Sequence, residues 1–117
     1  MTLKSPELRL VDIIDAIEHI YRTTAGISLE EFQGDLDRRR IVERNVEIIS
    51  EASRRLTDDV KERHPEIPWK KVAGIGNIVR HAYENVSANA LWKLTHDDLP
   101  VLEKACREEK EKVRLGK

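Results

Sequence analysis

The sequence predicts an all-α protein, an up-and-down helical bundle of four main helices with short helices between them. Apolar residues recur at three- and four-residue steps along most of the 117 residues, which is the spacing that places them on one face of a helix. Runs with the two-residue alternation of strands are nearly missing. The expected connections are only a few residues long, which favours antiparallel neighbours. The length suits a single domain over residues 1–117 with a modest core.

The first helix is expected at about residues 6–24. Ser5 and Pro6 stand where an N-cap and a first-turn proline belong, and Gly26 is the expected stop. Residues 1–5 are expected to fray. The apolar stripe of this helix consists of Leu10, Ile13, Ile14, Ile17 and Ile20 or Tyr21.

Two capping signals open the next helices. Ser28 followed by Glu31 predicts a capping box for a short helix that ends near Gly34. Asp35 is the expected cap of a long third helix that continues to Pro65. The apolar stripe of the third helix consists of Ile41 or Val42, Val46, Ile49, Ala52, Leu56 and Val60. Its opposite face carries Arg38, Arg39, Glu43, Glu47, Glu51, Arg54 and Arg55.

A rigid Pro-x-x-Pro link, "HPEIPW", follows the third helix. Pro68 is expected to open a fourth helix over about residues 68–86. The stretch "VSANALWKL" then continues as a helix or breaks briefly at Ser87. Trp69 and Trp92 are expected to be at least partly buried.

The last helix is expected to begin at Asp97 or Asp98, either of which would serve as its cap. Pro100 then lies in the first turn, where proline is tolerated. Residues 107–117 are rich in charge and are expected to fray.

The composition limits the classes of function. Basic residues (21) and acidic residues (22) nearly cancel, so contact with RNA or DNA would need a local basic patch. The one cysteine, Cys106, excludes an internal disulfide framework and indicates a reducing compartment; we expect it to be a small buried hydrophobe. The start lacks a secretory signal and no apolar run of about 18 residues exists, so we expect a cytoplasmic protein without a membrane span.

Neither a metal nor a cofactor is expected. The four histidines, His19, His64, His81 and His96, are scattered along the chain, and no two of them stand at ligand spacing. The glycines Gly74 and Gly76 do not follow a strand, so they are no dinucleotide-binding fingerprint.

The stretch "GIGNIVRHAYENV" (residues 74–86) concentrates side chains that can carry chemistry. On one helix, Asn77 and His81 align with Glu84 or Asn85, and Gly76 aligns with Arg80. An imidazole transfers protons near neutral pH and a guanidinium holds a phosphate through two hydrogen bonds. His81, Arg80 and Asn77 therefore form a minimal set for metal-free RNA cleavage, in which the 2′-hydroxyl attacks its own phosphodiester.

Structural interpretations of the same residues stay open. Arg80 and Glu84 at i and i+4 would form an ordinary ion pair on one helix face. A lone histidine such as His81 is more often polar surface or a satisfied interface group. Tyr83 is more often a core residue with its hydroxyl at the rim.

Several phrases of the sequence, taken together, resemble the HepT-like family of small all-helical proteins within the HEPN group. The resemblance covers about residues 7–105 and depends on three phrases above all. The phrases are "EIISEA" (residues 47–52), "IPW" (residues 67–69) and "NIVRHAY" (residues 77–83).

This resemblance implies a function. Members of the family are typically toxins of two-gene (type VII) toxin–antitoxin systems and are considered metal-independent endoribonucleases. Their signature is an Arg, four to six residues, then His-x-Tyr. The His corresponds to His81, the Tyr to Tyr83 and the polar residue after the motif Arg to Asn77. The motif Arg itself corresponds to Gly76, so this chain departs from the family pattern there.

Two interpretations of that departure remain. Arg80, one helical turn after Gly76, would return a guanidinium to nearly the same place, with Gly76 leaving room for it. Alternatively, the protein is a non-catalytic helical dimer that binds a nucleotidyltransferase. A glycine within a helix also indicates close packing against something, for which we expect a second copy of the chain.

The resemblance also implies partners. They are an RNA substrate, a second copy in a homodimer or higher homo-oligomer formed through the motif helix, and an MntA-like nucleotidyltransferase antitoxin. That antitoxin would add AMP to the tyrosine at position 83, and the added negative charge would block a phosphate site.

Overall fold

The computed structural model describes residues 6–81 and 84–116, with the backbone alone for residues 6, 77–81 and 84–87. Every regular element in these ranges is helical, which confirms the predicted all-α class. None of the described helices is long and apolar enough to cross a membrane. The helices in order are α1 (Pro6–Thr24), α2 (Leu29–Gln33), α3 (Leu36–Arg54), α4 (Asp58–Arg63), α5 (Trp69–His81), α6 (Glu84–Lys93), the π-helix η1 (Leu94–Asp98) and α7 (Leu99–Arg114).

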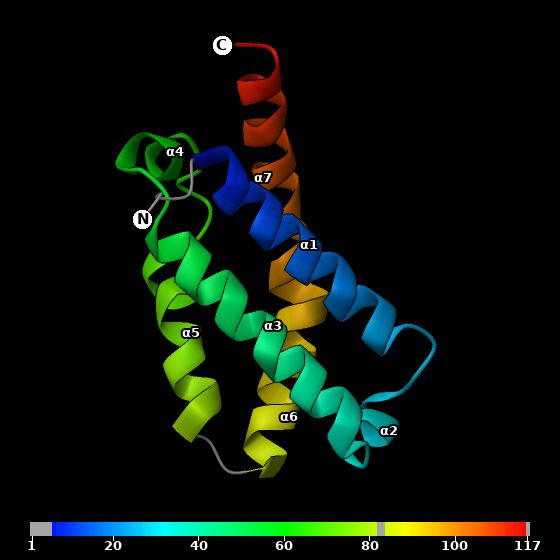
Figure 1. Cartoon of the computed structure of the whole chain (residues 1–117). Coiled ribbons are helices and arrows are strands. Elements are labelled where there is room, and N and C mark those ends of the chain that lie inside the picture. Colours follow the sequence, from blue (N-terminus) through cyan, green and yellow to red (C-terminus); the bar gives the residue numbers. More distant parts are fainter. Residues whose placement is uncertain (1–5, 82–83, 117) are drawn as a thin grey trace, which may run out of the picture.

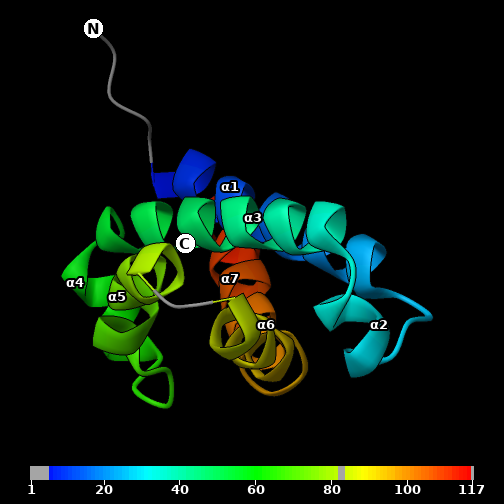
Figure 2. The same cartoon turned by 90° about the horizontal axis from the view of Figure 1, so that it is seen from below.

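Helices α1 and α3 form the centre of the fold. They run side by side in opposite directions, and α2 lies at the turn between them (Figure 1). Helix α7 covers α1, while α5 packs on α3. Seen from below, α5 and α6 lie on the same side of α3 (Figure 2). The helix that carries the candidate chemistry is therefore held against the central helix α3.

Local signals in the sequence set the first three helices as predicted. Gly26 adopts a positive φ of 75° directly after α1, a conformation that favours glycine. Both hydrogen bonds of the Ser28–Glu31 capping box are present. The carboxylate of Asp35 accepts a hydrogen bond from the backbone N–H of Arg38 and so caps α3. The expected cap Ser5 lies outside the described residues.

The third helix is shorter than predicted. It ends at Arg54 instead of continuing to Pro65, and a separate helix α4 follows. Thr57 adopts an extended backbone at the start of α4, so the chain bends there. Leu56 and Val60 are nevertheless buried as the stripe predicted. The periodicity continues because both helices bury an apolar face on one core, although the helix itself does not continue.

One residue assigned to the polar face of the third helix is in fact buried. Only 8% of Arg39 is exposed, whereas the apolar Ile41 is 37% exposed. Val42, the alternative to Ile41 in the stripe, is fully buried. The polar face of α3 is therefore narrower than the sequence suggested, because α3 is covered on more than one side.

The predicted fourth helix, at about residues 68–86, is two helices. Helix α5 ends at His81, and α6 begins at Glu84 and runs in the opposite direction (Figure 1). Ile75 of α5 and Leu91 of α6 are both buried in the same core. One continuous helix over about 25 residues would be roughly 38 Å long and would carry one of these residues away from the core. Ser87, where a brief break was possible, lies within α6.

Helices α6, η1 and α7 form a continuous helical column (Figure 1). Asp98 does not cap α7 as expected, because its backbone is helical and its side chain makes no capping hydrogen bond. Pro100 lies in the first turn of α7 as predicted. The helix continues to Arg114, through most of the segment that was expected to fray, and Glu109 in that segment is buried.

The core is a single cluster built mainly from aliphatic side chains. Trp69 and Trp92 pack against it and are partly buried, as predicted. Cys106 is 1% exposed, which confirms that it is a small buried hydrophobe. The fully buried members with the largest side chains are Phe32, Leu10, Ile13, Ile17, Ile20, Leu91 and Leu99.

Candidate functional site

The last two turns of α5 carry the predicted site residues Asn77, Arg80 and His81. The structure describes their backbone, whereas their side chains lie outside the described part. Tyr83, the predicted AMPylation site, lies outside the described residues altogether. Three of the four predicted residues, Asn77, Arg80 and His81, therefore lie on one short segment at the end of α5, and α6 then runs in the opposite direction (Figure 1).

The end of α5 at His81 changes which residues share a helix face. Asn77 and His81 still align on α5, and so do Gly76 and Arg80. Glu84 belongs to α6, which runs in the opposite direction. The expected alignment of His81 with Glu84 or Asn85 is therefore wrong, and an i, i+4 helix pair between Arg80 and Glu84 has no continuous helix to support it.

Gly76 is a point of close approach between α5 and α3. A Cβ atom at position 76 would lie 3.2 Å from Ser50 Oγ and 3.4 Å from Ser50 Cβ. By contrast, a Cβ at Gly74 would meet nothing within 4 Å. The close packing expected at Gly76 is therefore present, but its neighbour is α3 of the same chain, where we had expected a second copy.

Ser50 is held firmly in that position. It is 1% exposed, and its hydroxyl donates a 2.5 Å hydrogen bond to the backbone oxygen of Ala73 on α5. Arg54 Nη1 donates to the same oxygen at 2.8 Å. The Cβ of an arginine at position 76, the residue of the family pattern, would press on this bonded serine. Gly76 thus permits the close α3–α5 contact without such a clash.

The part of α3 before its contact with Gly76 carries exposed arginines. Ala73 of α5 contacts Arg54 and Ser50 of α3, whereas Gly76, about one turn later, lies close to Ser50 and Glu47. The contact on α3 thus shifts toward the start of α3 as α5 proceeds. The first three turns of α3 precede this contact in the sequence. Two exposed arginines lie there, Arg40 paired with Glu43 at 2.9 Å and Arg44 paired with Glu47 at 3.8 Å.

A second polar cluster, which the sequence did not predict, surrounds Glu109 of α7. Its carboxylate is 3% exposed and accepts hydrogen bonds from Arg63 at 2.6 Å and 3.1 Å. His64 Nε2 lies 2.7 Å from the same carboxylate. The hydrogen bonds from Arg63, followed by that from His64, outweigh burial and lower the pKa of Glu109 to about 2.

The Glu109 cluster ties the Pro-x-x-Pro link to α7 directly before α5 begins. Trp69, the first residue of α5, adds two hydrogen bonds from its indole Nε1 to the backbone oxygens of Lys61 and His64, at 3.1 Å and 3.0 Å. No periodicity could reveal the pairing of His64 with Glu109, because the two residues are 45 positions apart. The cluster anchors the start of α5 and carries no nucleophile.

Other reactive groups do not form a competing site. Burial raises the pKa of the Cys106 thiol to about 12, so this thiol is neutral and a poor nucleophile. Within residues 6–81 and 84–116, no group of histidine, cysteine and carboxylate side chains is arranged to hold a metal ion.

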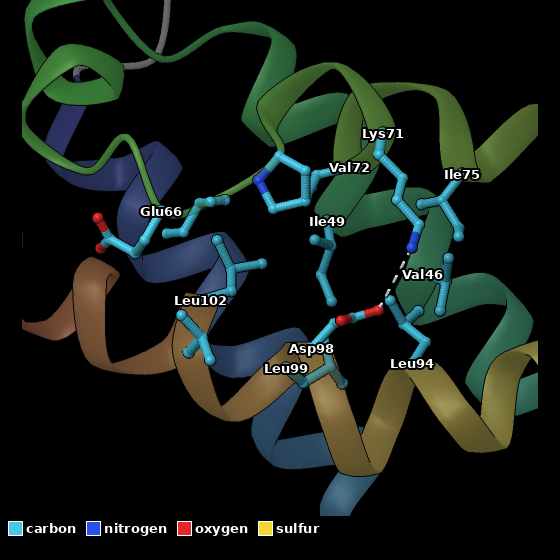
Figure 3. A pocket seen from close by; sticks show the side chains of 13 residues that line it. Val46, Ile49, Glu66, Lys71, Val72, Ile75, Leu94, Asp98, Leu99 and Leu102 are labelled. Carbon is cyan, nitrogen blue, oxygen red and sulfur yellow. Dashed lines mark ion pairs between the residues drawn. The ribbon is translucent and has the colours of Figure 1, made fainter.

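An apolar pocket lies between α5 and the column of η1 and α7 (Figure 3). We call it the α5–α7 pocket. Its volume is about 90 Å³, and α3 contributes its floor through Val46 and Ile49. Lys71 reaches over its mouth toward Asp98, at 4.0 Å (Figure 3). The walls include Val72 and Ile75 of α5 and Leu94, Leu99 and Leu102 of η1 and α7.

A family model and several known proteins are similar to this chain. A family model described as "Ribonuclease HepT-like" matches residues 13–109. The chain is 42% identical to a protein named "Probable ribonuclease HepT" from Thermococcus cleftensis, over 80% of this chain and 84% of that protein. It is 34% identical to "Putative RNase MJ1380" from Methanocaldococcus jannaschii, over 89% of this chain and 95% of that protein. No solved structure gives a match.

Proposed function

We infer, from the premise that this chain belongs to the Ribonuclease HepT-like family, that it is a metal-independent endoribonuclease whose site is the end of α5. The observation that carries this proposal is the placement of Asn77, Arg80 and His81 in the last two turns of one helix that is fixed against α3. A fixed helix holds catalytic groups in a constant mutual geometry, which proton transfer requires.

In the proposed reaction the 2′-oxygen of a ribose forms a bond to the adjacent phosphorus, and the bond to the 5′-oxygen breaks. His81 takes or delivers one of the two protons that move in this step. Arg80 stabilises the charge that develops on the phosphorane oxygens, and Asn77 orients the imidazole or the phosphate. The exposed arginines Arg40 and Arg44 of α3 would bind the RNA backbone by exchanging their partners Glu43 and Glu47 for phosphates.

We further propose that the protein is the toxin of a type VII toxin–antitoxin pair and acts as a homodimer or higher homo-oligomer. An MntA-like nucleotidyltransferase antitoxin would transfer AMP to Tyr83. The transferred phosphoryl group would place negative charge beside Arg80 and His81 and so compete with the RNA phosphate.

The environment of Gly76 favours a second candidate function. The family arginine is absent, and a Cβ at position 76 would lie only 3.2 Å from Ser50 Oγ, which disfavours a side chain there. The chain would then be a non-catalytic helical partner of a nucleotidyltransferase. Arg80 lies on the same face of α5, one turn after Gly76. If Arg80 takes the role of the family arginine the chain is a ribonuclease, and if it does not the chain is the non-catalytic partner.

The experiment compares the purified chain with its His81→Ala and Arg80→Ala variants on tRNA and mRNA in the presence of EDTA. Loss of a general acid or base costs about 100-fold or more in rate, so His81→Ala should nearly abolish cleavage. His96→Ala is the matched control, because His96 is an exposed histidine on η1 and should cleave like the parent. Cleavage by all variants would indicate contamination, and cleavage by none, including the parent, would favour the non-catalytic partner.

AMPylation is tested by intact mass after co-expression with a nucleotidyltransferase encoded beside the gene. The chain has two tyrosines, so Tyr21→Phe is the matched control for Tyr83→Phe. We expect added AMP units in the parent and in Tyr21→Phe, and none in Tyr83→Phe. An unmodified parent would contradict regulation at Tyr83 and leave the ribonuclease proposal standing.

A further inference from the structure

We propose that Arg54 of α3 is a positioning residue that fixes the last two turns of α5, the segment that carries Asn77, Arg80 and His81. The fixing of α5 is a property of the fold, and its consequence for cleavage rests on the proposed ribonuclease function. In this role Arg54 acts through the backbone oxygen of Ala73 rather than on RNA itself.

Arg54 binds α5 at the backbone oxygen of Ala73. Its Nη1 donates to this oxygen at 2.8 Å, and the hydroxyl of Ser50 donates to the same oxygen at 2.5 Å. In an α-helix this oxygen also accepts a hydrogen bond from the backbone N–H four residues later, that of Asn77, and α5 is helical through His81. Because the guanidinium is charged, its hydrogen bond is stronger than that of a neutral donor. The strong bond from α3 therefore reaches α5 one turn before the first predicted site residue.

The face of α5 that is bound to α3 leads directly to the site. Ala73, Gly76 and Arg80 follow one another at steps of three and four residues, so their backbone positions share one face of the helix. At Ala73, α3 donates two hydrogen bonds, and at Gly76 a Cβ would lie 3.2 Å from Ser50 Oγ. Position 80 is one turn further along this face. A shift of Ala73 relative to α3 would therefore move position 80 as well, because the two positions belong to one rigid helix.

Glu51 orients Arg54 for this contact. Arg54 Nη2 donates to one carboxylate oxygen of Glu51 at 2.5 Å, while Nη1 of the same guanidinium reaches Ala73. Arg55 Nη2 donates to the other oxygen of Glu51 at 2.9 Å. The hydrogen bonds from Arg54 and then Arg55 lower the pKa of Glu51, so its carboxylate stays ionised at neutral pH. The planar guanidinium of Arg54 thus has one partner on α3 and one on α5, which sets its orientation.

Arg55 provides a matched control for Arg54. The two arginines are neighbours in the chain, pair with the same carboxylate of Glu51 and have similarly exposed side chains, at 43% for Arg54 and 54% for Arg55. Replacement of either arginine by glutamine removes one positive charge beside Glu51. Among the described hydrogen bonds, however, the one to Ala73 comes from Arg54. A difference between the two glutamine variants therefore reports on the contact with α5.

The first test measures steady-state RNA cleavage by the parent, Arg54→Gln, Arg54→Lys and Arg55→Gln. Misplacement of catalytic groups by about 1 Å costs up to about 100-fold in rate, so Arg54→Gln should lower kcat by about tenfold or more. Its KM should change by less than about twofold, because the lost interaction is not one with the substrate. Arg54→Lys keeps a charged donor and should recover part of the loss, and Arg55→Gln should cleave like the parent. A rise in KM alone, equal in both glutamine variants, would assign both arginines to RNA binding and overturn the proposal.

The second test is native-state hydrogen exchange of the backbone amides, which needs no activity. We expect residues 77–81 to exchange about fivefold faster in Arg54→Gln than in the parent, because a hydrogen bond from a charged donor is lost there. The amides of α1 should keep the parent rate, and Arg55→Gln should leave both helices unchanged. Equal acceleration in α1 and α5 would show a general loss of stability and would overturn the positioning role. Unchanged exchange at residues 77–81 in Arg54→Gln would overturn it as well.

The two tests distinguish failure of this inference from failure of the ribonuclease proposal. If the parent does not cleave RNA but residues 77–81 exchange faster in Arg54→Gln alone, the ribonuclease proposal fails and the fixing of α5 by Arg54 is supported. If the parent cleaves RNA and Arg54→Gln matches Arg55→Gln in both measurements, the positioning role fails and the ribonuclease proposal stands.

Discussion

Helices α1 and α5 both pack on α3, but through different chemistry. The buried face of α1 is a stripe of large aliphatic residues, among them Ile13 and Ile17, which are fully buried. The contact of α5 with α3 instead uses a glycine, a serine and one backbone oxygen, that of Ala73, which accepts two hydrogen bonds. Helix α1 is thus held on α3 by burial of apolar surface, whereas α5 is held by its close approach to α3 at Gly76 and by polar contacts at its start.

This difference indicates a division of roles. Aliphatic packing is tolerant of detail and supplies most of the stability of a domain. A contact through small residues and fixed hydrogen bonds sets the position of a helix more narrowly, which suits a helix that carries catalytic groups. The following experiments test whether the two contacts differ as described.

The largest effect is expected in the aliphatic contact of α1. Ile17→Ala removes a fully buried side chain and should lower the free energy of unfolding by about 2–5 kcal/mol, measured by urea denaturation. Leu8→Ala in the same helix is the control, because half of Leu8 is exposed; its effect should stay within about 0.5 kcal/mol. Equal effects at the two positions would show that α1 is not held by this stripe.

The second effect concerns the polar anchor of α5. Glu109→Gln removes the charge that binds Arg63 and His64 and should lower the free energy of unfolding by about 2–3 kcal/mol at neutral pH. Glu108→Gln is the control, because Glu108 is the exposed neighbour on α7 and should change stability little.

The same variant carries a pH signature. The Arg63 hydrogen bonds lower the pKa of Glu109 in the folded protein from the ordinary glutamate value of 4.5 to about 2. The stability that this carboxylate contributes is therefore fully present above pH 4.5 and is lost as pH falls from 4.5 toward 2. Urea denaturation across this range should show a steeper loss for the parent than for Glu109→Gln. Parallel pH profiles would contradict the anchoring role of the carboxylate.

The smallest effect tests the close approach itself. Alanine is favoured over glycine within a helix by about 1 kcal/mol, so Gly74→Ala, with open space around its Cβ, should stabilise the protein by up to that amount. Gly76→Ala meets Ser50 Oγ at 3.2 Å and should lose this gain, with a net destabilisation of about 1 kcal/mol.

A double-mutant cycle locates the cause of the Gly76 effect. Ser50→Ala removes the hydroxyl that Gly76→Ala would press against, so the two changes together should cost less than their sum by about 0.5–1 kcal/mol. Additive effects, or stabilisation by Gly76→Ala alone, would show that α3 and α5 have room to move apart.

The sequence by itself determined the all-α class, the first three helix starts and most of the core. These features depend on signals within about one helical turn, such as the Ser28–Glu31 capping box and the Asp35 cap, or on a periodicity that names the buried face. The resemblance carried by the residues around His81 pointed to the family to which the chain belongs. Interactions between residues that are close in sequence can be predicted, because the backbone itself fixes their geometry.

Only the tertiary structure decided where the chain turns and what lies beside the site. The reversal between α5 and α6 escaped prediction because both helices bury an apolar face on the same core, so the periodicity continues across the turn. The Glu109 anchor and the Ser50 contact at Gly76 join residues 45 and about 25 positions apart. Such contacts depend on how whole helices pack, and the spacing of residues in the sequence does not specify that packing. A glycine at position 76, for example, is compatible with many different neighbours on α3.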